Sequence, residues 1–154
     1  MRADEKWMLI AIEEAKLAAE AGEVPVGAVI VRDGALVARA HNLCERKGMA
    51  TAHAELLAIE AACQALGCWR LSDCTLYVTL EPCSMCAGAV VNARLPRVVY
   101  GAKDPRMGAC GSLLDLSAYP LECRPKWESG VLEEESLDLL RRFFSKMREK
   151  RKNN

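Results

Sequence analysis

Apolar positions recur along this chain with two different periods, and the period separates helices from strands. Residues 4–21 carry apolar side chains at helical spacing, which predicts an amphipathic helix. Residues 24–31 are rich in β-branched apolar side chains and predict a strand. The turn residues at 32–34 then lead into a second apolar segment at 35–40. These segments together predict a helix followed by a strand hairpin.

Helical and strand patterns alternate after the hairpin. Good helix formers continue from Thr51, a candidate cap, to about residue 66, and Pro82 stands where another helix can begin. The remaining predicted elements are strands at 74–80, 97–102 and 123–128, and a final amphipathic helix at 131–150. Residues 148–154 are expected to fray. Strands separated by helices favour an α/β fold with a mostly parallel sheet behind the opening hairpin.

Length and composition narrow the class of protein. The chain has 154 residues, of which 51% are hydrophobic, so we expect a single domain over residues 1–154 with one packed core. The sequence contains no apolar run of the roughly 18–20 residues that a membrane helix needs, and its N-terminus does not resemble a signal peptide. We therefore expect a cytoplasmic protein without a membrane partner. The formal net charge of zero means that any nucleic-acid contact must use a local basic patch.

Two of the eight cysteines stand close together. Cys83 and Cys86 follow a Glu-Pro step and are three residues apart. Clustered thiols in a reducing cytosol favour metal binding or catalysis over disulfides. A thioredoxin-like redox pair is an alternative, although no aromatic residue precedes Cys83. The cysteines expected to be ordinary packed or partly exposed thiols are Cys44, Cys63, Cys68, Cys74, Cys110 and Cys123.

His53 can supply a third metal ligand. It opens a predicted helix, with Glu55 two residues later, and the carboxyl ends of strands in an α/β sheet bring such helix starts together. One histidine and two thiolates can hold Zn²⁺ with a fourth position open for water, and Glu55 is placed to take a proton from that water. A lone His or Glu at a helix start is usually a cap or a surface residue. The conjunction with the Cys83/Cys86 pair favours a zinc enzyme.

The pattern His-Ala-Glu followed by Pro-Cys-x-x-Cys matches the signature of zinc deaminases. Further segments resemble bacterial tRNA-specific adenosine deaminases in the same order, over nearly all of residues 5–150. They are EVPVGAVIV, HN at 41–42, TAHAE, LYVTLEPCSMCAGA, RVVYGAKDPRMGACGS and FFSKMR. The signature alone would fit cytidine, deoxycytidylate, guanine and riboflavin-pathway deaminases as well. A deaminase of a free base or nucleoside is therefore the alternative.

The resemblance implies both a fold and an activity. The fold is a three-layer α/β/α cytidine-deaminase-like arrangement, with a mixed five-stranded sheet and helices on both faces. The activity is hydrolytic deamination of adenosine to inosine at the wobble position of a tRNA anticodon, expected to be that of an arginine tRNA with the anticodon ACG. It implies one Zn²⁺ per chain bound by His53, Cys83 and Cys86, Glu55 as the proton shuttle, and a homodimer that binds the tRNA anticodon stem-loop.

The resemblance also implies substrate contacts. Those expected at the target nucleotide are Val26, Asn42, Pro82 and Asp104. Each has a simpler interpretation as well, because Asn42 could be a turn residue, Val26 a core strand residue and Asp104 a turn cap. The expected RNA contacts are Lys103, Arg106, Phe144 and Arg148. Residues 141–154 hold seven Arg or Lys and one acid, although a helix dipole favours the same arrangement.

Overall fold

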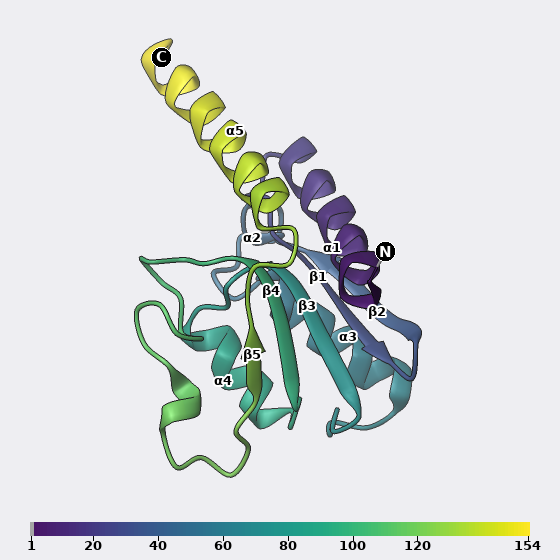
Figure 1. The fold of residues 1–154 in the computed structure, drawn as a ribbon. Coiled ribbons are helices and arrows are strands. Elements are labelled where there is room, and N and C mark those ends of the chain that lie inside the picture. Colours follow the sequence, from purple (N-terminus) through teal and green to yellow (C-terminus); the bar gives the residue numbers. More distant parts are fainter. Residues whose placement is uncertain (1) are drawn as a thin grey trace.

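The computed structural model describes residues 2–154, which form one five-stranded sheet covered by helices (Figure 1). The elements in chain order are α1 (Ala3–Glu20), β1 (Gly27–Arg32), β2 (Ala35–His41), α2 (Cys44–Lys47), α3 (Ala54–Leu66), β3 (Cys74–Leu80), α4 (Ser84–Asn92), β4 (Arg97–Ala102), the 3-10 helix η1 (Leu116–Ala118), β5 (Lys126–Glu128) and α5 (Glu133–Lys152).

The sheet has the strand order β2-β1-β3-β4-β5 and is mixed. Strand β1 is antiparallel to both β2 and β3, whereas β3, β4 and β5 are parallel to one another. The hairpin of β1 and β2 forms because Asp33 and Gly34 both adopt positive φ, which a tight turn requires. The expected mixed five-stranded sheet behind an opening hairpin is confirmed.

Helices cover both faces of the sheet, and each face has its own apolar core. Ala58 of α3 and Val90 of α4 pack with Leu76 and Val98 of the sheet in the larger core. On the other face, Trp7, Met8 and Ile12 of α1 pack against Val29 and Val99, and Leu139 of α5 joins them. Figure 1 shows α3 and α4 behind the sheet and α1 in front, with α5 running past α1 and projecting beyond the sheet. The three-layer α/β/α arrangement is confirmed.

Three local expectations differ from the structure. Helix α3 begins at Ala54 with His53 at its N-cap, so Thr51 is not the cap. Helix α5 continues to Lys152, through most of the tail expected to fray, because its acidic first turn and basic last turn suit the helix dipole. The short helix α2 was not expected, and the buried carboxylate of Glu23 accepts hydrogen bonds from the N–H groups of Glu45 and Arg46 in its first turn (2.9 and 2.8 Å).

Across residues 2–154, no helix combines the length and apolarity needed to cross a membrane.

The strand directions bring four chain segments to one end of the sheet. Gly27, the first residue of β1, pairs with His41, the last of β2, and Leu80 at the end of β3 pairs with Ala102 at the end of β4. The segments that flank these residues therefore converge. Gly27 also allows α1 to pack closely on β1, because a Cβ there would lie 1.9 Å from the carbonyl oxygen of Ala11.

Candidate active site

Three side chains of types that can bind a metal ion, His53, Cys83 and Cys86, meet at this end of the sheet. The Nδ1 atom of His53 lies 3.7 Å from the sulfur of Cys83 and 3.5 Å from the sulfur of Cys86. All three ligand atoms lie within 4.8 Å of one another. His53 and Cys83 are the N-cap residues of α3 and α4, and neither side chain caps its own helix. Both side chains are therefore available to a ligand.

The spacing and chemistry of these atoms fit a tetrahedral zinc ion. Zinc bonds of about 2.3 Å to sulfur and about 2.05 Å to nitrogen, at a tetrahedral angle, place the two ligand atoms about 3.6 Å apart. The observed nitrogen–sulfur distances of 3.5 and 3.7 Å bracket this value. One imidazole and two thiols leave a fourth tetrahedral position for water or substrate. The residues could therefore hold a metal ion without rearrangement.

The two thiols influence each other's ionisation. Hydrogen bonds from the Cys86 thiol and from His53 lower the pKa of Cys83 to about 4. The hydrogen bond to Cys83 and burial raise the pKa of Cys86. The hydrogen bond with Cys83 raises the pKa of His53. This part of the chain therefore stabilises a thiolate beside a histidine, which is the state of a cysteine that binds a metal.

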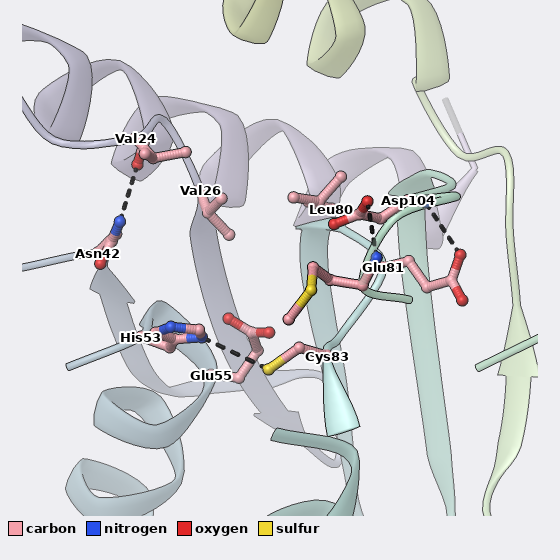
Figure 2. A pocket seen from close by; sticks show the side chains of 10 residues that line it. Val24, Val26, Asn42, His53, Glu55, Leu80, Glu81, Cys83 and Asp104 are labelled. Carbon is pink, nitrogen blue, oxygen red and sulfur yellow. Dashed lines mark hydrogen bonds between the residues drawn. The ribbon is translucent and has the colours of Figure 1, made fainter. Parts of the chain in front are cut away.

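Glu55 lies in the first turn of α3, beside the three ligand atoms. Its side chain is buried, with 4% exposed, and Figure 2 shows its carboxylate between His53 and Cys83. Burial raises the pKa of Glu55, because a low-dielectric environment disfavours the charged carboxylate. A carboxyl group with a raised pKa can both accept and return a proton near neutral pH.

A cavity of about 220 Å³ opens above these residues. Its lining residues are Val24, Val26, Asn42, His53, Glu55, Leu80, Glu81, Cys83, Asp104 and Met107. Two of the candidate metal-binding side chains, a buried acid and apolar walls thus surround one space that an aromatic base can enter (Figure 2).

The residues expected to contact substrate divide into two groups. Val26, Asn42 and Asp104 line the cavity, whereas Pro82 is buried and is not among the residues that line it in the described part of the chain. Asn42 also holds its own turn, because its side chain accepts a hydrogen bond from the N–H of Cys44 (3.2 Å). The Asp104 side chain accepts hydrogen bonds from the N–H groups of two following residues. Both side chains therefore organise a turn at the edge of the cavity.

The sequence analysis did not select four lining residues as site residues. These are Val24, Leu80, Glu81 and Met107. The three apolar ones had no distinguishing signal, because apolar residues beside strands are usually core. Glu81 did have a distinguishing signal in the sequence, since it is a charged residue that directly follows an apolar strand and precedes the Cys83 turn.

A larger hollow of about 940 Å³ adjoins the cavity and shares Val24 and Asn42 with it. Arg106, Phe144 and Arg148 line this hollow, and the ring of Phe144 is 44% exposed. Lys103 lines a third hollow together with Arg106 and Phe144. The four residues expected to contact RNA thus lie around hollows that continue from the cavity to α5.

The remaining cysteines and the second histidine lie outside the metal triad. All eight cysteines are free thiols, and Cys74 and Cys110 are buried. Burial raises the pKa of Cys74 to about 11, so it is an inert core thiol. His41 Nδ1 lies 3.1 Å from Glu14 of α1, which indicates a structural contact.

Comparisons with known proteins agree with this geometry. A model of the MafB19-like deaminase family matches residues 2–148. The chain is 53% identical over 153 residues to a tRNA-specific adenosine deaminase of Bacillus subtilis, covering 99% of this chain and 95% of that protein.

Two solved structures are similar over most of the chain. One comes from a study of A-to-I editing by tRNA:A34 deaminases at the wobble position of transfer RNA. It has a TM-score of 0.85 and 46% identity, covering 88% of this chain and 99% of that one. The other is a guanine deaminase of Bacillus subtilis, with a TM-score of 0.64 and 36% identity over 90% of this chain and 92% of that one. Sequence identity is greater for the tRNA enzymes, and this chain belongs to the family of tRNA-specific adenosine deaminases.

Proposed function

We propose that this chain hydrolyses adenosine to inosine at the wobble position of a tRNA anticodon, with one Zn²⁺ per chain. The observation that carries the proposal is the continuity of the cavity above His53 and Glu55 with the hollow beneath α5. A free base needs only the cavity, whereas a nucleotide in a loop also needs a surface for its neighbours. The relatives named as tRNA-specific adenosine deaminases support the same substrate class.

The chemistry divides between the metal and Glu55. A zinc ion bound by His53, Cys83 and Cys86 would lower the pKa of a coordinated water to about 7 and so supply the nucleophile. Glu55 accepts the proton of the attacking water and gives a proton to N1 of adenine as C6 is attacked. Glu55 then takes the remaining proton from the hydroxyl now attached to C6 and delivers it to the departing amine, so that adenosine and water become inosine and ammonia. The raised pKa of Glu55 suits both transfers.

The cavity walls orient the base for this attack. Val26 and Leu80 offer apolar surface to the adenine ring. Asn42 donates one side-chain N–H to the carbonyl of Val24 (3.4 Å), and its second N–H is available to the nucleotide. Asp104 can accept from a ribose hydroxyl, because a carboxylate oxygen accepts more than one hydrogen bond. Pro82 is buried beside Cys83, and its carbonyl accepts a hydrogen bond from the N–H of Ala109 (2.8 Å).

Helix α5 and the segment after β4 would bind the rest of the tRNA anticodon loop. Arg106, Arg148 and Phe144 all line the same hollow. Guanidinium groups bind phosphates, and an exposed aromatic ring stacks on a base that has left the helical stack. Lys103 adds positive charge at the adjoining hollow.

The homodimer and the cytoplasmic location are also part of the proposal. Val90 and Val91 of α4 are buried in the chain's own core, so they do not supply a partner surface. An exposed groove between α3 and α4 includes Leu56 and Trp69, and Trp69 is 52% exposed. This groove suits a self-complementary interface. Light scattering at micromolar concentration tests it, and a monomer would contradict it without affecting the chemistry.

The decisive experiment presents tRNA and free substrates to the zinc-loaded protein. An arginine tRNA transcript with the anticodon ACG is incubated beside adenosine, cytidine and guanine, and inosine is detected as G in sequenced cDNA. We expect conversion at the wobble position alone. Deamination of free guanine or cytidine without conversion of the tRNA would favour the alternative function, to which the similar guanine deaminase structure points.

A further inference from the structure

Glu81 is a buried carboxylate that the mechanism does not use. It directly follows β3, and only 2% of the residue is exposed. Its Oε1 atom accepts hydrogen bonds from the N–H of Asp104 (3.1 Å) and from the hydroxyl of Ser112. Its Oε2 atom accepts from the N–H groups of Cys110 (3.0 Å) and Ser112 (3.1 Å). One side chain thus binds both ends of the segment 104–112, which we call the wall loop.

The wall loop also contacts the metal-ligand turn through its backbone. The N–H of Ala109 donates to the carbonyl of Pro82 (2.8 Å), and Cys83 and Gly108 form an antiparallel bridge. Glu81 is therefore at the junction of two parts of the site. Pro82 and the ligand Cys83 follow it in the chain, and the wall loop surrounds its carboxylate.

Gly108 shows how closely the wall loop packs around Glu81. A Cβ at this position would lie 2.3 Å from both Cδ and Oε2 of Glu81 and 2.5 Å from the carbonyl oxygen of Asp104. No side chain fits there without displacing the carboxylate or the loop backbone. The close approach therefore requires glycine at residue 108.

The wall loop carries two side chains into the cavity. Asp104 and Met107 both line the cavity above His53 and Glu55, and Glu81 lines it too. The other end of the loop, near Cys110, is part of the main apolar core. A change in how Glu81 holds the loop would therefore move a wall of the cavity, whereas His53 and Cys86 are held by α3 and α4, which pack in the core.

We propose that Glu81 is a positioning residue for substrate binding, whose carboxylate holds the wall loop so that Asp104 and Met107 contact the target nucleotide. This inference rests on the proposed function for the identity of the substrate. A carboxylate is required because all four groups that face it are donors. An amide of the same shape would replace one accepting oxygen with a donating NH₂, which would face at least one backbone N–H in either orientation.

The sharpest test is Glu81→Gln in the full-length zinc-loaded protein. We expect KM for an anticodon stem-loop to rise about tenfold or more, because the contacts of Asp104 and Met107 with the bound substrate are lost. The value of kcat should change less than about threefold, because Glu55 is unaffected. Ser112→Ala removes one donor and should raise KM by a smaller factor. The matched controls are Glu122→Gln, an exposed carboxylate paired with Arg94, and Ser72→Ala, an exposed hydroxyl before β3. Both should retain the wild-type KM.

Hydrogen exchange of the wall loop provides a readout that does not depend on activity. In Glu81→Gln, the amides of residues 104, 110 and 112 should exchange faster, while zinc content and exchange in α3 stay at wild-type levels. If the wild type does not act on tRNA, the proposed function fails, but this measurement still tests the positioning role. Wild-type exchange and wild-type KM in Glu81→Gln would overturn the proposal. Loss of zinc would also overturn it, because Glu81 would then support the metal turn.

Gly108→Ala gives an independent route to the same result. The added methyl group should displace the Glu81 carboxylate and raise KM to a similar extent. In a double-mutant cycle, Gly108→Ala combined with Glu81→Gln should cost much less than the sum of the two single changes, because both act on the same contact. Additive effects of the two substitutions would contradict a shared role. If Glu81→Gln folds poorly, the KM of Gly108→Ala alone still tests whether displacement of the wall loop weakens substrate binding.

Discussion

The imidazole Nδ1 of His53 lies 3.7 Å from the sulfur of Cys83, although 30 positions separate the two residues in the chain. Each is the N-cap residue of a helix, and the two helices, α3 and α4, pack together on the same face of the sheet. The site therefore forms where two helix starts meet. Its integrity depends on the packing of that face as well as on the ligands.

Replacing a metal ligand should remove the metal. We expect about one zinc per wild-type chain and less than a tenth of that in His53→Ala, because two thiolates alone leave the tetrahedral site incomplete. The variant should also unfold at a lower temperature. Elemental analysis and thermal unfolding measure both effects. His41→Ala is the control, since this histidine contacts Glu14 instead of the site. Active wild-type protein without metal would contradict the prediction.

Glu55→Gln should separate metal binding from proton transfer. Because Glu55 lies beside the ligands without being one of the three, the variant should keep its zinc. The single-turnover rate should fall by about 10²- to 10⁴-fold, since a proton shuttle contributes that much to catalysis. Quench-flow kinetics with saturating enzyme give this rate directly. A decrease of only a few-fold would exclude the shuttle role.

The ion pair between Asp4 and Arg97 should make stability depend on pH. Hydrogen bonds from Arg97 lower the pKa of Asp4 and also that of Glu128. A carboxylate with a depressed folded-state pKa contributes stability above its unfolded pKa of about 4, and the contribution is lost as pH falls through the folded-state value. Arg97→Gln should therefore cost about 1–3 kcal/mol at pH 7 and much less at pH 3.

Urea unfolding at several pH values measures this difference. The control is Arg94→Gln, which also removes an arginine from an ion pair with a glutamate. Its partner Glu122 is 83% exposed, and such pairs contribute little in water. A free-energy difference for Arg97→Gln that is the same at pH 7 and pH 3 would show that the arginine acts through packing alone.

Substitutions on α5 should weaken RNA binding without affecting the metal. Phe144→Ala should lower affinity for the anticodon stem-loop about 5- to 150-fold, the usual value of one stacked base. Arg148→Ala should lower the slope of log K against log salt by about 0.7–0.9, the contribution of one phosphate. Lys152→Ala removes a charge from the same helix outside the hollow and is the control. Equal effects of Arg148→Ala and Lys152→Ala would indicate only nonspecific attraction.

Truncation after Leu140 should separate the two ends of α5. The C-terminal segment that contains α5 contacts the core through the apolar side chains of Val131, Leu132 and Leu139. The shortened chain retains all three residues. We therefore expect a folded protein with its zinc but a kcat/KM for tRNA reduced by at least about tenfold. Circular dichroism, elemental analysis and the tRNA assay at subsaturating substrate give the three quantities. Unchanged kcat/KM would mean that the second half of α5 has no part in recognition.

Local patterns in the sequence were sufficient for most of the sheet but not for the helix boundaries. The strands at 74–80 and 97–102 match the structure because mostly apolar runs rich in β-branched and aromatic residues, nearly all of them buried, are typical of central strands. The start of α3 was misplaced because Thr51 is a good cap by residue type. The observed N-cap is His53, whose side chain faces the site instead of the helix. A residue whose local preference is overridden by a tertiary contact cannot be placed from propensity alone.

The sequence by itself determined the donor set, because one histidine and two cysteines that open separate helices are a chemical pattern independent of distance. It also determined where the central strands lie, because strands that are buried on both faces are mostly apolar. Only the tertiary structure decided which residues surround the cavity. Glu81 and Met107 are not close to His53 in the sequence, and they reach the cavity because parallel β3 and β4 end side by side. Residue type limits what a side chain can do, whereas strand order and direction decide which side chains can act together.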